Sequence, residues 1–121
     1  MSKGILLFGH GARNHEYAEP FHRIKAAMQA REPDAKIEIG FLELQQPTFE
    51  EAIDALVRHG VTDVRIVPIF FAPGRHVLKD LPERAAFALD RYPNLNVEVA
   101  DAVGMVPSVV DAMADYALGK P

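Results

Sequence analysis

The chain has 121 residues, of which 49% are hydrophobic and 25% charged, so its composition is that of an ordinary globular protein and excludes the disordered and fibrous classes. The net charge of −4 and the scattered basic residues argue against nucleic acid or an anionic membrane as partner. The absence of cysteine excludes disulfides and cysteine nucleophiles, so a metal site would have to use nitrogen and oxygen ligands.

The length and the distribution of apolar residues predict one domain over residues 1–121. No apolar run approaches the roughly 18 residues that a membrane span needs. Residues 1–3 lead directly into a short strand and not into the core of a signal peptide. We therefore expect a cytoplasmic protein that does not enter a membrane.

The first half of the chain predicts strand, helix, strand and helix. Lys3–Gly9 is an apolar strand, and residues 15–31 carry apolar side chains at helical spacing. Lys36–Phe41 alternates between apolar and polar residues as a second strand does. A capping box at Thr48 opens a helix that Gly60 ends.

The second half predicts the same alternation. Asp63–Phe71 is nearly continuous in apolar residues, which is typical of a central strand covered on both faces. The helix that follows contains Pro82, which we expect in its first turn. Leu95–Ala100 is a fourth strand, and the last helix begins at Pro107 or the next residue. The residues of this helix that we expect to face inward are Val109, Val110, Met113 and Ala117.

Four strand–helix units in succession predict an α/β, three-layer fold. Its four-stranded parallel sheet has the order 2-1-3-4, with helices on both faces and right-handed crossovers. In such sheets ligands bind beyond the carboxyl ends of the strands, where the strand order reverses. That place lies between the first and third strands, so the loops that follow these two strands are the candidate site.

Each of these two loops contains glycine, arginine and histidine. Residues 9–13 read Gly-His-Gly-Ala-Arg, and residues 72–76 read Ala-Pro-Gly-Arg-His. We expect His10 and His76 to face each other across the crevice, with Glu43 supplied by the loop after the second strand. Two imidazoles and a carboxylate are a suitable ligand set for a divalent transition metal with open positions. The glycines beside His10 would leave room for a broad ligand to approach the backbone.

Other residues near this crevice have two interpretations each. Arg13, Arg75 and Lys79 would draw an anionic ligand to the mouth, or they are solvated loop charges, which is the favoured interpretation of Lys79. Phe71 and Pro73 form an apolar wall, or they belong to the core and the turn. Glu43 is either a ligand or a solvated carboxylate. The remaining histidines are interpreted as surface residues: His15, His22 and His59.

Several common chemistries fit poorly. A dinucleotide site would need a third glycine where the chain has Asn14, and no phosphate-binding loop follows the first strand. Ser2 and Ser108 are the only serines, and neither occupies a strand-to-helix elbow at the crevice. A histidine phosphatase would need an arginine directly before His10, where the chain has Gly9, and it remains a remote alternative.

Three segments resemble the sirohydrochlorin chelatases. Residues 9–13 are similar to the family's opening motif G-H-G-[SA]-R, with Ala12 where many members have serine. Residues 68–82 are similar to its second motif, P-x-F-x-x-x-G-x-H-V-x-x-D-[IL]-P. Phe41, Glu43 and Pro47 match a third element. The resemblance spans essentially the whole chain.

The resemblance implies a short-form class II chelatase with the chelatase-like fold. Such an enzyme, a lyase, inserts Co²⁺, Fe²⁺ or Ni²⁺ into sirohydrochlorin without ATP, in cobalamin or sirohaem biosynthesis. The metal is then a substrate, and no tightly bound cofactor is expected. Because longer relatives contain two such halves, the resemblance also implies a homodimer. The alternative from another class is a carrier that binds the metal or the tetrapyrrole without catalysis.

The resemblance also assigns roles to residues. His10 would be a metal ligand and the proton acceptor, His76 a second metal ligand, and Glu43 a further candidate ligand. Histidine suits both tasks, because an imidazole exchanges a proton near neutral pH. The residues expected to bind the macrocycle are Arg13, Glu43, Gln45, Phe71, Ala72, Pro73, Gly74, Arg75, His76 and Val77.

Overall fold

The computed structural model describes residues 2–72 and 74–120, except for the side chains of residues 76–78. Strands and helices alternate along the chain as the sequence predicts. The elements, with η denoting a short 3-10 turn, are β1 (Lys3–Gly9), η1 (His15–Ala18), α1 (Glu19–Arg31), β2 (Lys36–Phe41), α2 (Phe49–Arg58), β3 (Asp63–Pro68), α3 (Arg75–Arg91), β4 (Asn96–Val99), η2 (Val103–Met105) and α4 (Pro107–Ala117).

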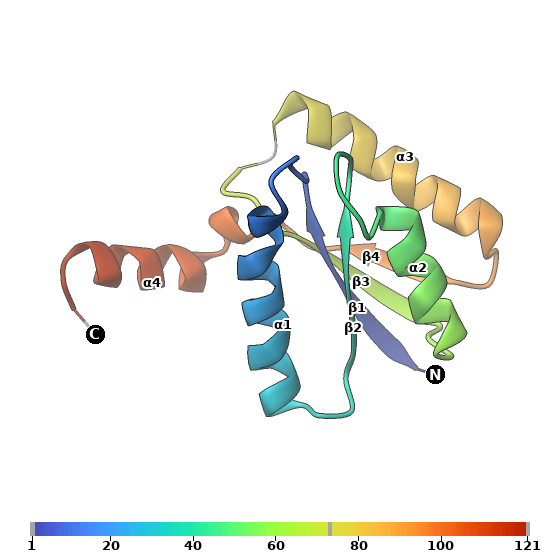
Figure 1. Ribbon diagram of the computed structural model, residues 1–121, viewed down its shortest axis with the longest axis horizontal. Helices are drawn as coiled ribbons and strands as arrows, with labels where there is room; N and C mark the ends of the chain where they lie inside the picture. The colour runs from blue at the N-terminus through green and yellow to red at the C-terminus, as the bar shows by residue number, and fades with distance from the viewer. Residues whose placement is uncertain (1, 73, 121) are drawn as a thin grey trace.

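The strands form one parallel sheet in the order β2-β1-β3-β4, which confirms the predicted topology. Helix α1 covers one face of the sheet, and α2 and α3 cover the other (Figure 1). Phe8 of β1 pairs with Pro68 of β3, and Gly9 pairs with Phe41 of β2. The carboxyl ends of these three strands therefore lie at one edge, where the candidate loops begin.

The core has two layers because successive strand residues point to opposite faces of the sheet. Leu6 and Phe8 pack toward α2 and α3, whereas Leu7 packs toward α1. Phe8 meets the ring of Phe49 edge to face at 5.7 Å. None of the helices in the described part of the chain is long and apolar enough to cross a bilayer.

Strand β3 differs from its prediction in length and in burial. It ends at Pro68 and not at Phe71, because Phe70 leaves the strand direction to pack on the ring of Phe8 at 6.0 Å. Only its face toward α2 and α3 is well covered, and Arg65 on the other face is exposed. The prediction that both faces of this strand are covered was wrong.

Pro82 lies inside α3, about two turns from the start of the helix, so its expected place in the first turn was also wrong. The helix begins at Arg75 because Gly74, in an extended conformation, serves as its N-cap. The first residues of the second candidate loop therefore belong to a helix.

Helix α4 does not pack on the sheet, which contradicts the inward-facing residues expected of it. It extends away from the body of the fold (Figure 1), and residues 107–120 include no buried side chain. The inward set of Val109, Val110, Met113 and Ala117 was thus predicted from helical spacing without the tertiary contact it implies. Its extensive contacts within the described chain are with η2. The sheet face beside α1 is therefore open over β3 and β4.

Candidate functional site

The loop after β1 is hydrogen-bonded to the loop after β2. The N–H of Leu42 donates to the carbonyl oxygen of Gly9 at 3.0 Å, and that of Glu43 donates to the carbonyl oxygen of His10 at 3.1 Å. The N–H of Ala12 donates to Oε1 of Gln45 at 2.9 Å. The pairing of β1 with β2 thus continues past the sheet, and it brings His10 and Glu43 together.

His10 contacts a carboxylate and a carbonyl through its two ring nitrogens. Its Nε2 lies 3.3 Å from Oε1 of Glu43, and its Nδ1 lies 3.2 Å from the carbonyl oxygen of Gly11. A carbonyl oxygen only accepts, so Nδ1 carries a hydrogen in this contact. Nε2 is then the nitrogen that exchanges a proton or binds a metal ion next to the carboxylate. The side chains are 39% and 47% exposed, so a ligand can reach both.

The His10–Glu43 pair supplies two donors of different kinds. Among the side chains that the structure describes, no three of the metal-binding types converge on one point. The side chain of His76, the second predicted ligand, lies outside the described residues. A histidine with one carboxylate leaves most positions of a bound metal open. Such a site can hold a metal that must later be transferred.

Gly11 makes this arrangement possible. Its φ is +95°, and a Cβ atom there would lie 1.9 Å from the carbonyl oxygen of Glu43. Gly9 is likewise constrained, because a Cβ atom would lie 2.4 Å from the ring of Phe21. The two glycines therefore make room for the protein's own atoms. Our expectation that they leave space for a broad ligand is not what their surroundings show.

We predict that Gly11→Ala lowers the free energy of unfolding by about 3 kcal/mol, because it combines a left-handed backbone with a main-chain clash. Gly60→Ala is a matched control. Gly60 also has a positive φ, +83°, but nothing lies within 4 Å of its Cβ position. That variant should lose only about 1 kcal/mol. Urea unfolding of both variants measures the difference, and equal losses would contradict the clash.

Gln45, which the sequence assigns to the macrocycle, uses its side-chain oxygen within the protein. Its Oε1 accepts the hydrogen bond from the Ala12 N–H, and the side chain is half-buried. It therefore braces the loop after β1. A macrocycle contact through its Nε2 atom stays a prediction.

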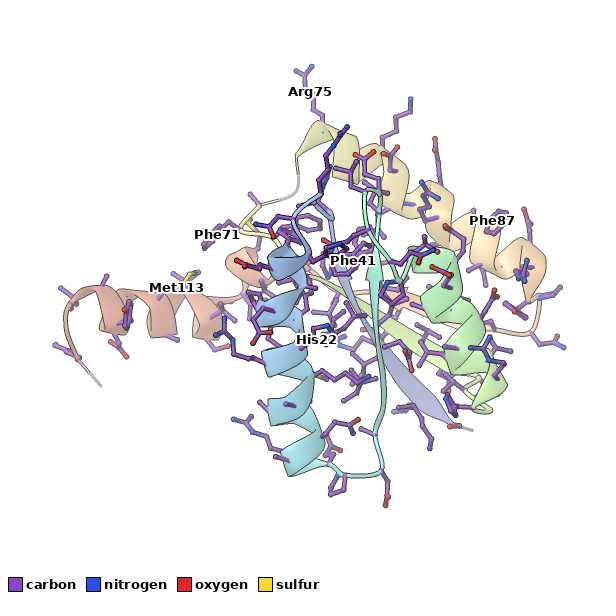
Figure 2. All side chains as sticks on the ribbon, in the orientation of Figure 1. His22, Phe41, Phe71, Arg75, Phe87 and Met113 are labelled. Atoms are coloured by element: carbon purple, nitrogen blue, oxygen red, sulfur yellow. The ribbon has the colours of Figure 1, made fainter. Side chains whose placement is uncertain are left out.

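The second candidate loop is exposed along its described part. Phe71, Ala72, Gly74 and Arg75 all face solvent, and Figure 2 shows Arg75 pointing away from the body of the fold at the start of α3. Arg13, from the first loop, is exposed too. Pro73 and the side chain of Val77 lie outside the described residues.

Sequence reasoning missed one residue of this region, Gly104. A Cβ atom there would lie 2.0 Å from the carbonyl oxygen of Phe71, so η2 touches the main chain of the second loop. The only signal was an isolated glycine between the fourth strand and the last helix. The interpretation of His15, His22 and His59 as surface residues is confirmed, since all three are exposed.

Comparison with solved structures defines the class. The sirohydrochlorin chelatase SirB from Bacillus subtilis subspecies spizizenii, solved with cobalt, matches with a TM-score of 0.83 and 31% identity over 98% of this chain and 51% of SirB. A CbiX protein from Marinobacter aquaeolei VT8 matches with a TM-score of 0.81 and 26% identity over 97% of this chain and 95% of that one. The fold and the His10 loop thus define a chelatase-like α/β protein.

The family follows from the sequence. The CbiX family matches residues 4–117, and the chain belongs to this family. The sirohydrochlorin ferrochelatase of Bacillus subtilis (strain 168) is 31% identical over 93% of this chain, which covers 43% of that relative. The chain thus spans less than half the length of this curated relative.

Proposed function

We propose that the chain is a sirohydrochlorin chelatase that inserts a divalent metal ion into the macrocycle. The observation that carries this proposal is the His10–Glu43 pair, with Nε2 and Oε1 3.3 Å apart and both side chains exposed. The similarity to relatives named ferrochelatase and to a cobalt-bound chelatase supports it. The proposal takes residues 1–121 as one domain and the metal as a substrate.

His10 and Glu43 would share the work of metal delivery and proton removal. Insertion of M²⁺ replaces two pyrrole N–H protons, so two protons must leave for each metal that enters. Nε2 of His10 binds the metal or accepts a proton, and the carboxylate of Glu43 is close enough to exchange a proton with it. Because the site has few donors, the metal is held weakly enough to be handed over. His76 would add a second imidazole.

The macrocycle would bind over the two exposed loops. Sirohydrochlorin carries eight carboxylates, which Arg13 and Arg75 would meet with charge-assisted hydrogen bonds. Phe71 is 77% exposed and offers an aromatic face to the ring. Ala72, Pro73, Gly74 and Val77 would complete the lining.

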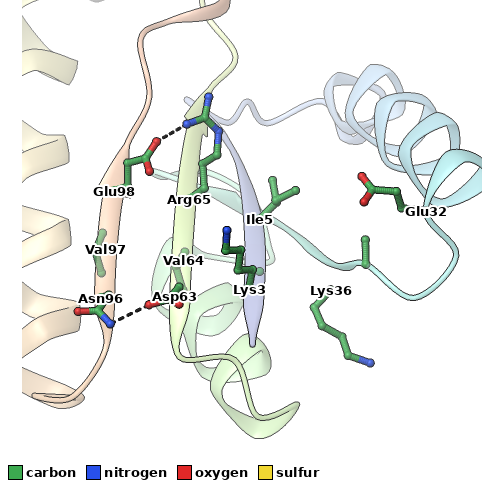
Figure 3. A pocket seen from close by; sticks show the side chains of 12 residues that line it. Lys3, Ile5, Glu32, Lys36, Asp63, Val64, Arg65, Asn96, Val97 and Glu98 are labelled. Carbon is green, nitrogen blue, oxygen red and sulfur yellow. Dashed lines mark hydrogen bonds and ion pairs between the residues drawn. The ribbon is translucent and has the colours of Figure 1, made fainter. Parts of the chain in front are cut away.

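We also propose a homodimer in which α4 of each copy covers the open sheet face of the other. SirB is about twice as long as the part that this chain matches, so a second copy would supply an equivalent half. Helix α4 exposes Val110 and Met113, which have no cover of their own. Figure 3 shows the groove on the open face, which has a volume of about 510 Å³ and crosses β1, β3 and β4.

The chemistry of the groove suits this helix. Ile5 lies along its floor, Lys3 at one end, and the ion pair of Arg65 with Glu98 at its side (Figure 3). Helix α4 combines apolar residues with two aspartates and has no basic residue. Its apolar side can cover the floor while the aspartates reach the basic rim.

A direct assay tests the catalytic proposal. The chain is mixed with metal-free sirohydrochlorin and with Co²⁺, Fe²⁺ or Ni²⁺ in turn, and the absorption of the macrocycle is followed at substoichiometric protein. We expect insertion to be faster than the spontaneous reaction and to continue for many turnovers. A carrier would instead bind one equivalent of metal or macrocycle and leave the insertion rate unchanged. A cytoplasmic location stays a prediction, which fractionation of expressing cells would test.

A further inference from the structure

The 3-10 turn η2 presses on the bend that follows β3. The N–H of Gly104 donates to the carbonyl oxygen of Phe70 at 2.9 Å. A Cβ atom on Gly104 would lie 2.0 Å from the carbonyl oxygen of Phe71 and 2.3 Å from its Cα atom. These are main-chain atoms, so no side-chain rotation could relieve the contact. Glycine is therefore required if η2 and the bend are to keep this distance.

The bend is held from both sides, and this determines which aromatic is free. Phe70 packs on the ring of Phe8 at 6.0 Å and belongs to the core. Phe71, the next residue, is 77% exposed (Figure 2). Extending the register of β1 and β3 by two residues from the pair Phe8–Pro68 brings His10 level with Phe70. The exposed ring therefore comes from the residue next to the one level with the metal-binding histidine.

The same turn leads without a linker into α4. The N–H of Met105 donates to the carbonyl oxygen of Ala102, and that of Val106 donates to Val103. The carbonyl oxygen of Val106 then accepts from Val109 and Val110, in the first turn of α4. Hydrogen bonds thus run continuously from Phe70 through η2 to α4. A movement of α4 would be felt at the bend.

We propose that Gly104 is a positioning residue, through which the placement of α4 sets the Phe71 bend for the macrocycle. This inference rests on the proposed function for the identity of the ligand. It makes the aromatic contact of one copy depend on the element that would dock on the other copy. A chain with α4 undocked would then bind the macrocycle less well, even with His10 and Glu43 unchanged.

A tryptophan reporter tests the proposal. The chain contains no tryptophan, so Phe71→Trp places a single fluorophore on the bend. We expect Gly104→Ala in this background to shift the emission maximum. In the natural Phe71 background it should raise KM for sirohydrochlorin about tenfold, as loss of one aromatic contact does, with little change in kcat. Met105→Ala is the matched control, because Met105 belongs to the same turn but its side chain is exposed.

The outcomes separate this proposal from the catalytic one. Unchanged emission in Gly104→Ala, or a shift without a change in KM, would overturn it. The emission needs no macrocycle, so a chain without chelatase activity would still report whether Gly104 positions the bend. If Gly104→Ala does not fold, the double variant Val110→Asp/Met113→Asp with Phe71→Trp takes its place. An emission change on undocking α4 supports the coupling, and an unchanged emission contradicts it.

Discussion

His10→Ala should lower the rate of metal insertion by about 100-fold or more, because one atom of this side chain would both bind the metal and accept a proton. The fold should survive. The side chain is 39% exposed, and its loss removes one hydrogen bond of 3.2 Å and one exposed ion pair. The free energy of unfolding should change by less than about 1 kcal/mol. Macrocycle absorption measures the rate, and urea unfolding measures the stability.

His59→Ala is the control for this experiment. His59 is an exposed histidine at the C-terminal end of α2, away from the carboxyl ends of the strands. Its replacement should leave the insertion rate at the level of the natural chain. Insertion by His10→Ala at a rate close to that of the natural chain would exclude His10 as the residue that delivers the metal or removes the proton.

Val110→Asp/Met113→Asp should convert the proposed dimer into monomers. Both side chains are exposed in the single chain, at 44% and 36%, so the substitutions cost the monomer little. In the dimer they would bury two carboxylates against an apolar floor, which weakens association by about 100-fold or more. Sedimentation velocity over a range of concentrations measures the change, and the insertion assay follows activity on the same samples.

The matched control adds the same charge to the other side of α4. Ser108→Asp/Ala112→Asp places two carboxylates on the face that already carries Asp111, so this variant should remain dimeric. A natural chain that sediments as a fully active monomer would contradict the homodimer. Equal behaviour of the two double variants would show that the apolar side of α4 is not the interface.

The fold was largely predictable because it follows from local patterns and connection rules. The apolar run of Lys3–Gly9 and the capping box at Thr48 are recognisable in a few residues, and the structure confirms both. The order of the strands follows from the right-handed crossovers that short connections allow. Pro82 shows the limit, since helical spacing did not reveal that α3 begins at Arg75.

The site was predictable only in part. The position of His10 at the end of β1 follows from the strand pattern, whereas Glu43 had two interpretations that the sequence could not separate. Its contact with His10 depends on the loop after β2 lying against the loop after β1, which the positive φ of Gly11 permits. Such contacts join residues far apart in the chain and leave no periodic signal.

The sequence by itself determined the order of elements, the parallel sheet and the delivery of His10 to its carboxyl edge, because these depend on periodicity and on short-range turn chemistry. Only the tertiary structure decided that α4 leaves the sheet uncovered, since its apolar spacing is the same whether it packs on its own sheet or on another surface. The same holds for Gly104 and Phe71, whose approach depends on main-chain atoms that meet only after the strands have assembled.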